Sequence, residues 1–377
     1  MEFHDLKAQY LALKTDIDQG IADVIGKGHF ILGEQVTQLE EELAKDAQRK
    51  HCVSCANGTD ALVLLMMLWG IGAGDAVFVP NFTYFASAVC AATVGASVIP
   101  VDIDPATFNI CPDALEAAIE RTISVGVLRP RVIIAVDLFG QPANYARIDQ
   151  IAKKYELLVL EDAAQGYGGS IHGKQACAFG DGAITSFFPA KPLGCYGDGG
   201  AIFVDSDEED ALLRSLRSNG RGITDKYDNQ RFGMNSRLDT MQAAILLPKL
   251  HALRQYELDA LDAAAARYTK ALSGDVIVPT VLSGYRSSWA QYSILLKDAP
   301  QRNAAQAYLK QQGIPTMIYY PRGIHQQTAF IDQHFSDAHY PNTLSVCERV
   351  LALPMHPYLT EQDSACVSNT LLDFLRR

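Results

Sequence analysis

The chain has 377 residues, of which 48% are apolar and 20% are charged, and its formal net charge at pH 7 is -11. A chain of this length buries a large core and has room for two domains. The acidic balance opposes a general nucleic-acid binder, which carries a basic surplus. No stretch approaches the roughly 18 uninterrupted apolar residues of a membrane-spanning helix. The charged start after Met1 lacks the apolar region of a signal peptide, so we expect a cytoplasmic protein without membrane or nucleic-acid partners.

Cysteine and histidine give no sign of a metal site. The eight cysteines are dispersed along the chain, and we expect reduced thiols. Cys52 and Cys55 have the spacing of redox and zinc motifs, but they fall in an expected buried strand and no second such pair exists. A structural role is the better interpretation of these cysteines. The histidines show no metal-binding pair at helical spacing, so no metal is predicted.

Two amphipathic helices are expected before residue 51, because apolar residues recur there at three- and four-residue intervals. From 51 to about 205, short apolar runs alternate with helical stretches. This alternation predicts an α/β fold with a mostly parallel sheet covered on both faces. The seven expected strands are residues 51–55, 76–80, 97–101, 131–137, 157–160, 182–187 and 201–204.

The second half of the chain is expected to contain an arm and a smaller α+β region. A helix over 206–218 is followed by a polar stretch, 219–231, that is too long for an ordinary turn and predicts an arm or a binding loop. Residues 237–272 predict a long helix with a kink or break at Pro248. Beyond Gly274 we expect strands at 276–279, 290–296 and 315–320, and helices at 302–312 and 361–375.

This pattern predicts two domains. The large domain spans 1–250 and includes the amino-terminal helices and an arm at about 219–235. The small carboxyl-terminal domain spans 251–377 and includes the linking helix.

Lys191 is the most informative residue. It lies in a glycine-rich segment after the strand 182–187, and Asp162 lies just beyond the apolar run 157–160. Alone, such a lysine is usually solvated, and such an aspartate is often a helix cap. Together they fit a pyridoxal phosphate site, where a lysine amine holds the aldehyde and a carboxylate keeps the pyridine nitrogen protonated. The position of Asp162 at the carboxyl end of a buried strand, where open α/β sheets bind ligands, favours this interpretation.

Other residues at strand ends suit the rest of such a cofactor. Gly58 and Thr59 open a helix after the first core strand, where exposed amides make an anion site, and Ser186 at a later strand end supplies a hydroxyl for phosphate. Tyr84 or Phe85 can cover a flat ring, although a core position suits Phe85 better. Gln165 lies one helical turn beyond Asp162 and can donate to the phenolic oxygen.

These motifs resemble the DegT/DnrJ/EryC1/StrS family of sugar aminotransferases, which are pyridoxal phosphate enzymes of the aspartate aminotransferase fold (fold type I). The similarity covers nearly the whole chain, and the motifs together are highly specific. The segments that carry it are 28–33, 57–62, 161–165, 186–200, 233–239 and 353–359.

The resemblance implies a role for each matching residue. Lys191 would hold pyridoxal 5'-phosphate and transfer the proton, and Asp162 would pair with the pyridine nitrogen. An asparagine like Asn235 reaches the phosphate of the neighbouring subunit, so the resemblance implies a homodimer with shared active sites. The remaining cofactor contacts would be Gly58, Thr59, Tyr84, Gln165 and Ser186.

The implied reaction is transamination from L-glutamate to a nucleotide-linked keto-sugar. The segment around Lys191 is most similar to enzymes that aminate C3 of UDP-2-acetamido-2-deoxy-3-oxo-glucuronate for surface polysaccharide, including lipopolysaccharide and its O-antigen. A uronate needs a cation, and Arg237 is the first candidate and Arg322 the second, because a guanidinium binds a carboxylate through two parallel hydrogen bonds. Further substrate contacts are expected from Tyr319, Tyr320 and His356.

Several alternatives stay open at this point. The enzymes that act at C3 carry His-Tyr-Pro where this chain has Tyr319, Tyr320 and Pro321, which keeps a C4 aminotransferase of a 4-keto-6-deoxy sugar in consideration. A non-sugar enzyme of the same fold type is the widest alternative. A sugar dehydratase would replace Lys191 by histidine, and a regulatory protein would have no need of the intact lysine and aspartate.

Overall fold

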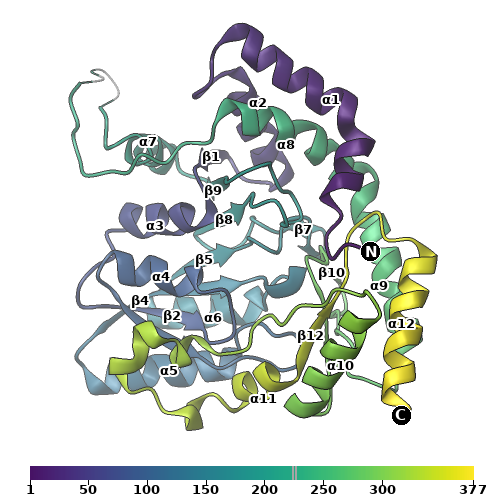
Figure 1. Cartoon of the computed structure of the whole chain (residues 1–377). Coiled ribbons are helices and arrows are strands. Elements are labelled where there is room, and N and C mark those ends of the chain that lie inside the picture. Colours follow the sequence, from purple (N-terminus) through teal and green to yellow (C-terminus); the bar gives the residue numbers. More distant parts are fainter. Residues whose placement is uncertain (223–224, 226) are drawn as a thin grey trace.

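The computed structural model describes residues 1–222, 225 and 227–377, and a seven-stranded sheet lies at its centre (Figure 1). Its strands are β1 (His51–Cys55), β2 (Asp75–Pro80), β3 (Ser97–Val101), β4 (Arg129–Val136), β5 (Leu158–Asp162), β8 (Gly182–Ser186) and β9 (Gly200–Val204). Their order is β1-β9-β8-β5-β4-β2-β3, and β9 runs antiparallel to both of its neighbours. The other pairs are parallel, so the prediction of one mostly parallel sheet is confirmed.

Helices cover both faces of this sheet, as the alternation of strands and helices predicts. The side chains of Val132 and Ile134 belong to one core and that of Ile133 to another, because successive residues of a strand point to opposite faces. The first core includes α3, α4 and α7; the opposite face carries α5 and α6, with α2 and α8 over its other end. The helices of this part are α1 (Leu6–Lys27), α2 (Glu34–Asp46), α3 (Gly58–Leu68), α4 (Ala86–Thr93), α5 (Pro112–Val125), α6 (Tyr145–Tyr155), α7 (Asp207–Leu216) and α8 (Thr240–Ala252).

The parallel strands bring the predicted site residues to one edge of the sheet. Asp162 is the last residue of β5 and Ser186 the last residue of β8, and these two strands pair in parallel. The start of α3 follows β1, which lies beyond β9. Polar side chains at these strand ends therefore converge.

The carboxyl-terminal part has its own apolar core around a two-stranded sheet. Leu261, Ile294, Leu309, Leu351 and Val367 belong to this core. Its elements are α9 (Leu258–Leu272), β11 (Tyr292–Leu295), α10 (Ala299–Gln311), α11 (Pro341–Arg349), β12 (Val350–Leu353) and α12 (Glu361–Leu375). Short additional elements are β6 (Ser170–Ile171), β7 (Lys174–Gln175) and β10 (Tyr285–Arg286), which form a small sheet, and the 3-10 turns Leu138–Gly140, Ile324–Gln326, Thr328–Gln333 and Asp337–His339.

Three expectations for this part were wrong in detail. The helix continues through Pro248, and the irregularity is a π-helical turn at Leu253–Glu257, between α8 and α9. The runs 276–279 and 315–320 form single bridges rather than strands, at Ile277 to Leu295 and Met317 to Ala352. Pro279 and Pro315 fall in these runs, and proline has no amide N–H to give to a ladder.

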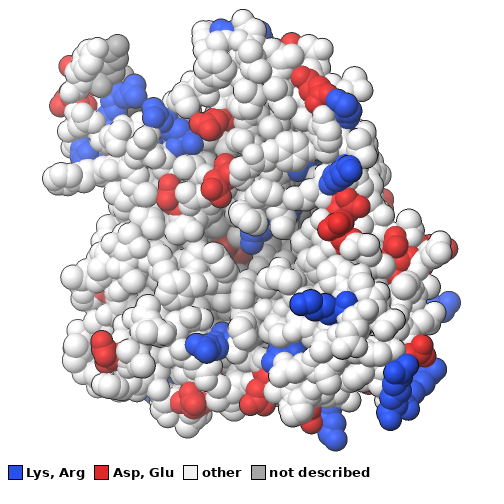
Figure 2. Space-filling model, viewed as in Figure 1, with Lys and Arg blue, Asp and Glu red and all other residues white. Residues whose placement is uncertain are grey.

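The polar stretch after α7 leaves the body of the molecule as the predicted arm (Figure 1). Its two sides face each other through bridges between Ser218 and Asn235 and between Arg221 and Asn229. Phe232 on the arm is 96% exposed. In the space-filling view the arm stands apart at the upper left, and the face is hollowed near its centre (Figure 2). Residues 223, 224 and 226 of the expected arm lie outside the described residues.

Within the described residues, none of the helices combines the length and the apolar character that crossing a bilayer requires.

Candidate active site

A cavity of about 420 Å³ opens where the strand ends converge. The amino-terminal end of α3, the carboxyl ends of β5 and β8, the loop after β8 and the segment after α10 all contribute to its wall. The structure thereby brings together residues that lie far apart in the sequence. The predicted site residues that line it are Gly58, Thr59, Tyr84, Asp162, Gln165, Ser186, Lys191, Tyr319 and Tyr320.

Asp162 offers a buried carboxylate to this cavity. Its exposed fraction is only 4%, and burial raises the pKa of the carboxyl above its usual value. Two hydrogen bonds oppose this effect, one donated by the Ser87 hydroxyl to Oδ2 (2.7 Å) and one by the backbone N–H of Ala164 to Oδ1 (3.2 Å). The nearby charge of Lys191 acts in the same direction. Such an oriented carboxylate suits a cationic partner, including a protonated pyridine nitrogen.

The backbone around Lys191 fixes its place in the wall. Its N–H donates to the Phe188 carbonyl (2.8 Å), and the Cys195 N–H closes the loop on the Phe187 carbonyl (2.8 Å). Gly194 is required there, because a Cβ would lie 2.4 Å from the Pro189 carbonyl oxygen. Lys249, buried beneath the loop, donates its amine to the Gly194 carbonyl.

The Lys191 amine has the electrostatic character of a base. Burial lowers its pKa below the usual lysine value, and the negative charge of Asp162 opposes that shift. Among the described residues, none accepts a hydrogen bond from this amine within the usual distance. A lysine with a depressed pKa is more often neutral near pH 7, as nucleophilic and general-base chemistry require.

The start of α3 forms the polar end of the cavity. Asn57 caps the helix by accepting the Asp60 N–H at 2.8 Å, and the chain turns into the helix at Gly58. A Cβ on Gly58 would come within 2.8 Å of the Ser186 Cβ, so glycine is what allows the Ser186 hydroxyl to lie against the helix start. Free amides at a helix start beside a hydroxyl are a suitable site for phosphate.

Gln165, Tyr320 and Tyr84 line the same cavity in different ways. The Gln165 side chain is held at both ends: its Oε1 accepts from the Phe139 N–H (2.7 Å) and its Nε2 donates to the Tyr320 hydroxyl (3.2 Å). Tyr84 is 58% exposed, so its ring stands at the mouth, 6.4 Å from the ring of Tyr320. Phe85 packs against Phe330 with ring centroids 5.8 Å apart, which agrees with the expected core position.

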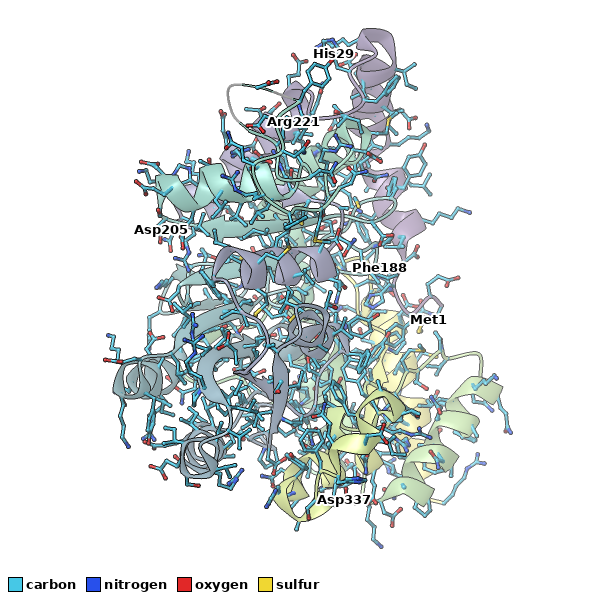
Figure 3. All side chains as sticks on the ribbon, turned by 90° about the vertical axis from the view of Figure 1, so that its left-hand side faces the viewer. Met1, His29, Phe188, Asp205, Arg221 and Asp337 are labelled. Carbon is cyan, nitrogen blue, oxygen red and sulfur yellow. The ribbon has the colours of Figure 1, made fainter. Side chains whose placement is uncertain are left out.

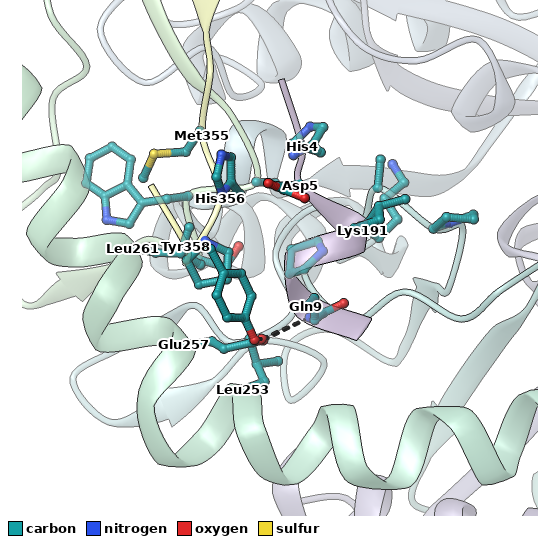
Figure 4. Close-up of a pocket in the computed structure, with 18 residues that line it drawn as sticks. His4, Asp5, Gln9, Lys191, Leu253, Glu257, Leu261, Met355, His356 and Tyr358 are labelled. Carbon is teal, nitrogen blue, oxygen red and sulfur yellow. Dashed lines mark hydrogen bonds between the residues drawn. The ribbon is translucent and has the colours of Figure 1, made fainter. Parts of the chain in front are cut away.

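Four of the predicted site residues lie outside this cavity. Asn235 and Arg322 are exposed, and Arg237 is half-buried, without lining the cavity of its own subunit. His356 lines a smaller, second cavity that reaches the other side of Lys191 (Figure 4). The functional roles assigned to these four residues, and to those that line the cavity, stay predictions.

Sequence reasoning missed two residues of the wall. Ser87, which donates to Asp162, lies on α4, one helical turn after the loop that contains Thr83 and Tyr84. His4 reaches both cavities from the chain's amino terminus. Ser87 could have been predicted, because it follows a strand end at the same edge of the sheet as Asp162. The position of His4 in the sequence gives no indication that it lies near Lys191.

The arrangement passes a direct test of fit for pyridoxal 5'-phosphate. Lys191, Asp162 and the Gly58 to Ser186 cradle lie around one cavity, and they provide the amine, the carboxylate and the anion site that this cofactor needs. The fold and this donor set define a pyridoxal-phosphate-dependent aminotransferase.

Comparison with known proteins specifies the class further. The chain belongs to the DegT/DnrJ/EryC1/StrS aminotransferase family, whose model matches residues 12–372. It is 44% identical over 360 residues, 95% of this chain and 96% of the relative, to the UDP-2-acetamido-2-deoxy-3-oxo-D-glucuronate aminotransferase of Pseudomonas aeruginosa.

Two solved structures cover the whole of this chain. A DegT DnrJ EryC1 StrS aminotransferase from Brucella abortus superposes with a TM-score of 0.96 at 46% identity, and 100% of each chain is covered. DesV of S. venezuelae, solved in complex with a ketimine intermediate, gives a TM-score of 0.94 at 32% identity over 100% of this chain and 98% of that chain. The predicted family, fold type and cofactor are thereby confirmed.

Proposed function

We propose that this enzyme transfers the amino group of L-glutamate to C3 of UDP-2-acetamido-2-deoxy-3-oxo-glucuronate, a step in the synthesis of surface polysaccharide such as lipopolysaccharide and its O-antigen. The observation that carries the proposal is the cavity that Lys191 and Asp162 share. The chain is also 44% identical to the Pseudomonas aeruginosa enzyme of that specificity. The similarity runs through nearly the entire length of both chains, which supports a shared substrate class.

The proposed chemistry assigns a distinct task to each side chain. Bound pyridoxal 5'-phosphate supplies the electron sink for the transferred electron pair. The amine of Lys191 takes the proton from the α-carbon of glutamate and, in the second half-reaction, delivers a proton to C3 of the sugar. Asp162, oriented by Ser87, keeps a negative charge against the pyridine nitrogen. Gly58, Thr59 and Ser186 hold the phosphate, and Gln165 faces the phenolic oxygen.

A homodimer is part of the proposal, because Lys191 is assigned to the cofactor and no further lysine or arginine among the described residues lines the cavity to bind a uronate. In the described part of the chain, no arginine lines the cavity. Arg237 and Asn235 lie instead at the base of the arm, and we assign them to the site of the partner subunit. Figures 1 and 3 place the arm, with Arg221, and His29 at the end of α1 toward the same end of the molecule.

Exposed apolar side chains support this assembly. Phe30, Ile31 and Leu32 beside α1 are 50%, 47% and 41% exposed, and Phe188 near Lys191 is 53% exposed. With Phe232 on the arm, these residues form a set that a second copy of the chain would cover. We also propose the domain division at residue 250 and a cytoplasmic location, the first supported by the separate apolar core around α9, α10 and α12.

One observation favours a second candidate. Tyr319 lines the cavity together with Tyr320, at the position where the resemblance implies a histidine in the most similar enzymes that act at C3. A wall of two phenols without an arginine of the same subunit also suits a neutral 4-keto-6-deoxy nucleotide sugar.

The experiment that separates these candidates is a substrate panel. The holoenzyme is incubated with L-glutamate and each of several nucleotide keto-sugars, and the aminated product is identified by mass and NMR. We expect the 3-oxo-uronate to give a 3-amino product with the greatest efficiency. A better turnover of a 4-keto-6-deoxy sugar would replace the proposal by the second candidate, and conversion of no keto-sugar would reject both.

A further inference from the structure

The amino terminus of the chain forms part of the wall beside Lys191. The Phe3 carbonyl accepts a hydrogen bond from the Met355 N–H (3.1 Å), and the Phe3 ring meets Tyr319 edge-on at 6.2 Å. These contacts hold the next residue, His4, where it lines both the main cavity and the smaller one behind Lys191. Figure 4 shows His4 between His356 and Lys191.

His4 has a hydrogen-bonding atom that the fold does not use. The Met355 backbone lies close enough to the imidazole ring to raise its pKa. The ring's Nε2 is buried and has no hydrogen-bond partner in the described part of the chain. A buried polar atom without a partner costs stability, so it is a place to search for a function.

The charge state of His4 determines what this atom can do. Burial, the proximity of His356 and the positive charge of Lys191 together lower the pKa of His4 to about 4, although the Met355 backbone acts in the opposite direction. His4 is therefore neutral at physiological pH, and in the tautomer that carries its proton on Nδ1 the Nε2 atom has a free lone pair. Asp5 and Glu257 also border the smaller cavity, and Asp162 borders the main one.

The same two cavities contain one strong donor that lacks an acceptor. Lys191 lines both of them, as His4 does, and its charge acts on the His4 ring. The amine has nothing to orient it when it is not attached to the cofactor, because no described residue accepts a hydrogen bond from it. An unpaired acceptor and an unpaired donor thus border the same space.

We propose that His4 is a positioning residue whose Nε2 accepts a hydrogen bond from the free ε-amine of Lys191. This contact holds the amine at the boundary of the two cavities during each half-reaction. In that interval the amine must take a proton and then return to the cofactor. The proposal rests on the proposed role of Lys191. It concerns a contact within the chain that forms when the free amine turns toward His4, and this contact needs no substrate.

Two substitutions with opposite properties test the contact. His4→Phe keeps a flat ring and removes the acceptor, whereas His4→Gln removes the ring and keeps an acceptor. His251→Phe is the matched control, because His251 is exposed and pairs with Glu42 outside both cavities. Thermal unfolding of each variant confirms that it is folded before it is compared.

The main readout is the pKa of Lys191 in the cofactor-free protein. Lysines are reductively methylated with ¹³C-formaldehyde, which leaves one N–H on the charged amine, and the Lys191 signal is assigned by its absence in Lys191→Arg. We expect the pKa of Lys191 to fall by about one pH unit in His4→Phe, a roughly tenfold change in the protonation equilibrium. His4→Gln and His251→Phe should titrate like the unsubstituted protein.

Kinetics of the loaded enzyme supply the second readout. The rate of the glutamate half-reaction should fall about tenfold in His4→Phe and recover in His4→Gln, with the apparent affinity for glutamate unchanged. An unshifted Lys191 pKa in His4→Phe, or a shift confined to His4→Gln, would overturn the proposal. If no keto-sugar is turned over, the proposed function fails, while the titration still decides the role of His4.

Discussion

The wall around Lys191 and the base of the arm differ in how many of their side chains are held by contacts within one chain. Asp162 is 4% exposed and receives hydrogen bonds from Ser87 and the backbone, so its position is fixed within the subunit. Asn235, beside the arm, is exposed, and Phe232 is 96% exposed. The first region is ready for the cofactor. The second has its polar and aromatic side chains directed away from the core of its own subunit.

This difference suggests a division of labour between subunits. Chemistry at the cofactor requires groups held to within a fraction of an ångström, which burial and hydrogen bonding inside one fold provide. Substrate recognition can instead come from a neighbour, because the proposed homodimer would position the arm.

Lys191→Ala should abolish turnover and leave the fold intact. The substitution removes the amine that holds the cofactor and moves the proton, at a position that borders a cavity rather than the core. The cofactor should still bind, without a covalent link, as absorbance and borohydride trapping will show. Steady-state transamination by this variant at a substantial rate would refute the role of Lys191.

Asp162→Asn should lower kcat by roughly 100- to 1,000-fold, because a neutral amide cannot stabilise a protonated pyridine nitrogen. Ser87→Ala should have a smaller effect. It removes one hydrogen bond to the Asp162 carboxylate and should lower kcat roughly tenfold. Both variants should retain the cofactor. Equal effects of the two substitutions would show that Asp162 acts only as part of the structure around it.

Arg237→Leu should separate the two half-reactions. Loss of a charge-assisted contact with the uronate, about 2 kcal/mol, corresponds to roughly a 30-fold lower kcat/KM for the 3-oxo-uronate. The glutamate half-reaction, measured by single-turnover absorbance, should be unchanged. Arg322→Leu makes the same test for Arg322, the second candidate residue for binding the uronate carboxylate. If both half-reactions decline together in Arg237→Leu, the arginine supports the interface and not the sugar.

A buried carboxyl pair behind the site makes stability depend on pH. Burial, opposed by hydrogen bonds from the Cys177 and Phe179 amides, raises the pKa of Glu161 to about 7, and burial beside Glu161 raises the pKa of Asp137 well above its usual value. The unfolded chain loses these protons near pH 4, whereas the folded chain retains one to about pH 7. The pair's contribution to stability is therefore complete below pH 4 and falls as the pH rises through the raised pKa values of the folded pair.

Asp137→Asn removes the part of this dependence that belongs to Asp137, with little change of shape. The Asp137 Oδ1 accepts hydrogen bonds from the Ala143 N–H and the Tyr145 hydroxyl, and the amide oxygen of asparagine can accept the same two bonds. The new NH2 group faces Glu161. From pH 5 to 7, the unfolding free energy of the unsubstituted protein relative to this variant should fall by roughly 1 kcal/mol per pH unit. Denaturant titrations at several pH values measure it, and parallel curves would contradict the assignment.

Sequence pattern predicted the regions where local rules decide the structure. The strand ending at Asp162 and the helix starting at Gly58 follow from apolar runs and helix-start chemistry, and all seven expected strands of the large sheet are present. β12 was missed because Val350–Leu353 is a short apolar run directly after a helix, which periodicity cannot distinguish from one more helical turn.

Contacts between distant segments could not be read in the same way. His4 joins the wall near Lys191 only because the Phe3 carbonyl pairs with Met355, more than three hundred residues later. The pairing of Asp137 with Glu161 likewise depends on the parallel register of β4 and β5. In the proposed homodimer, the position of Arg237 relative to a cavity would depend on a second subunit, which no pattern in one chain can supply.

Subunit complementation tests the shared site most directly. Chains carrying Lys191→Ala and chains carrying Arg237→Leu are mixed under conditions of subunit exchange, and amination of the 3-oxo-uronate is measured. Random exchange between two-fold dimers should restore about a quarter of the unsubstituted activity, since half of the dimers are mixed and each has one intact site. A chain with both substitutions, mixed with either single variant, is the control without rescue. Absence of recovered activity after demonstrated exchange would contradict a site shared between subunits.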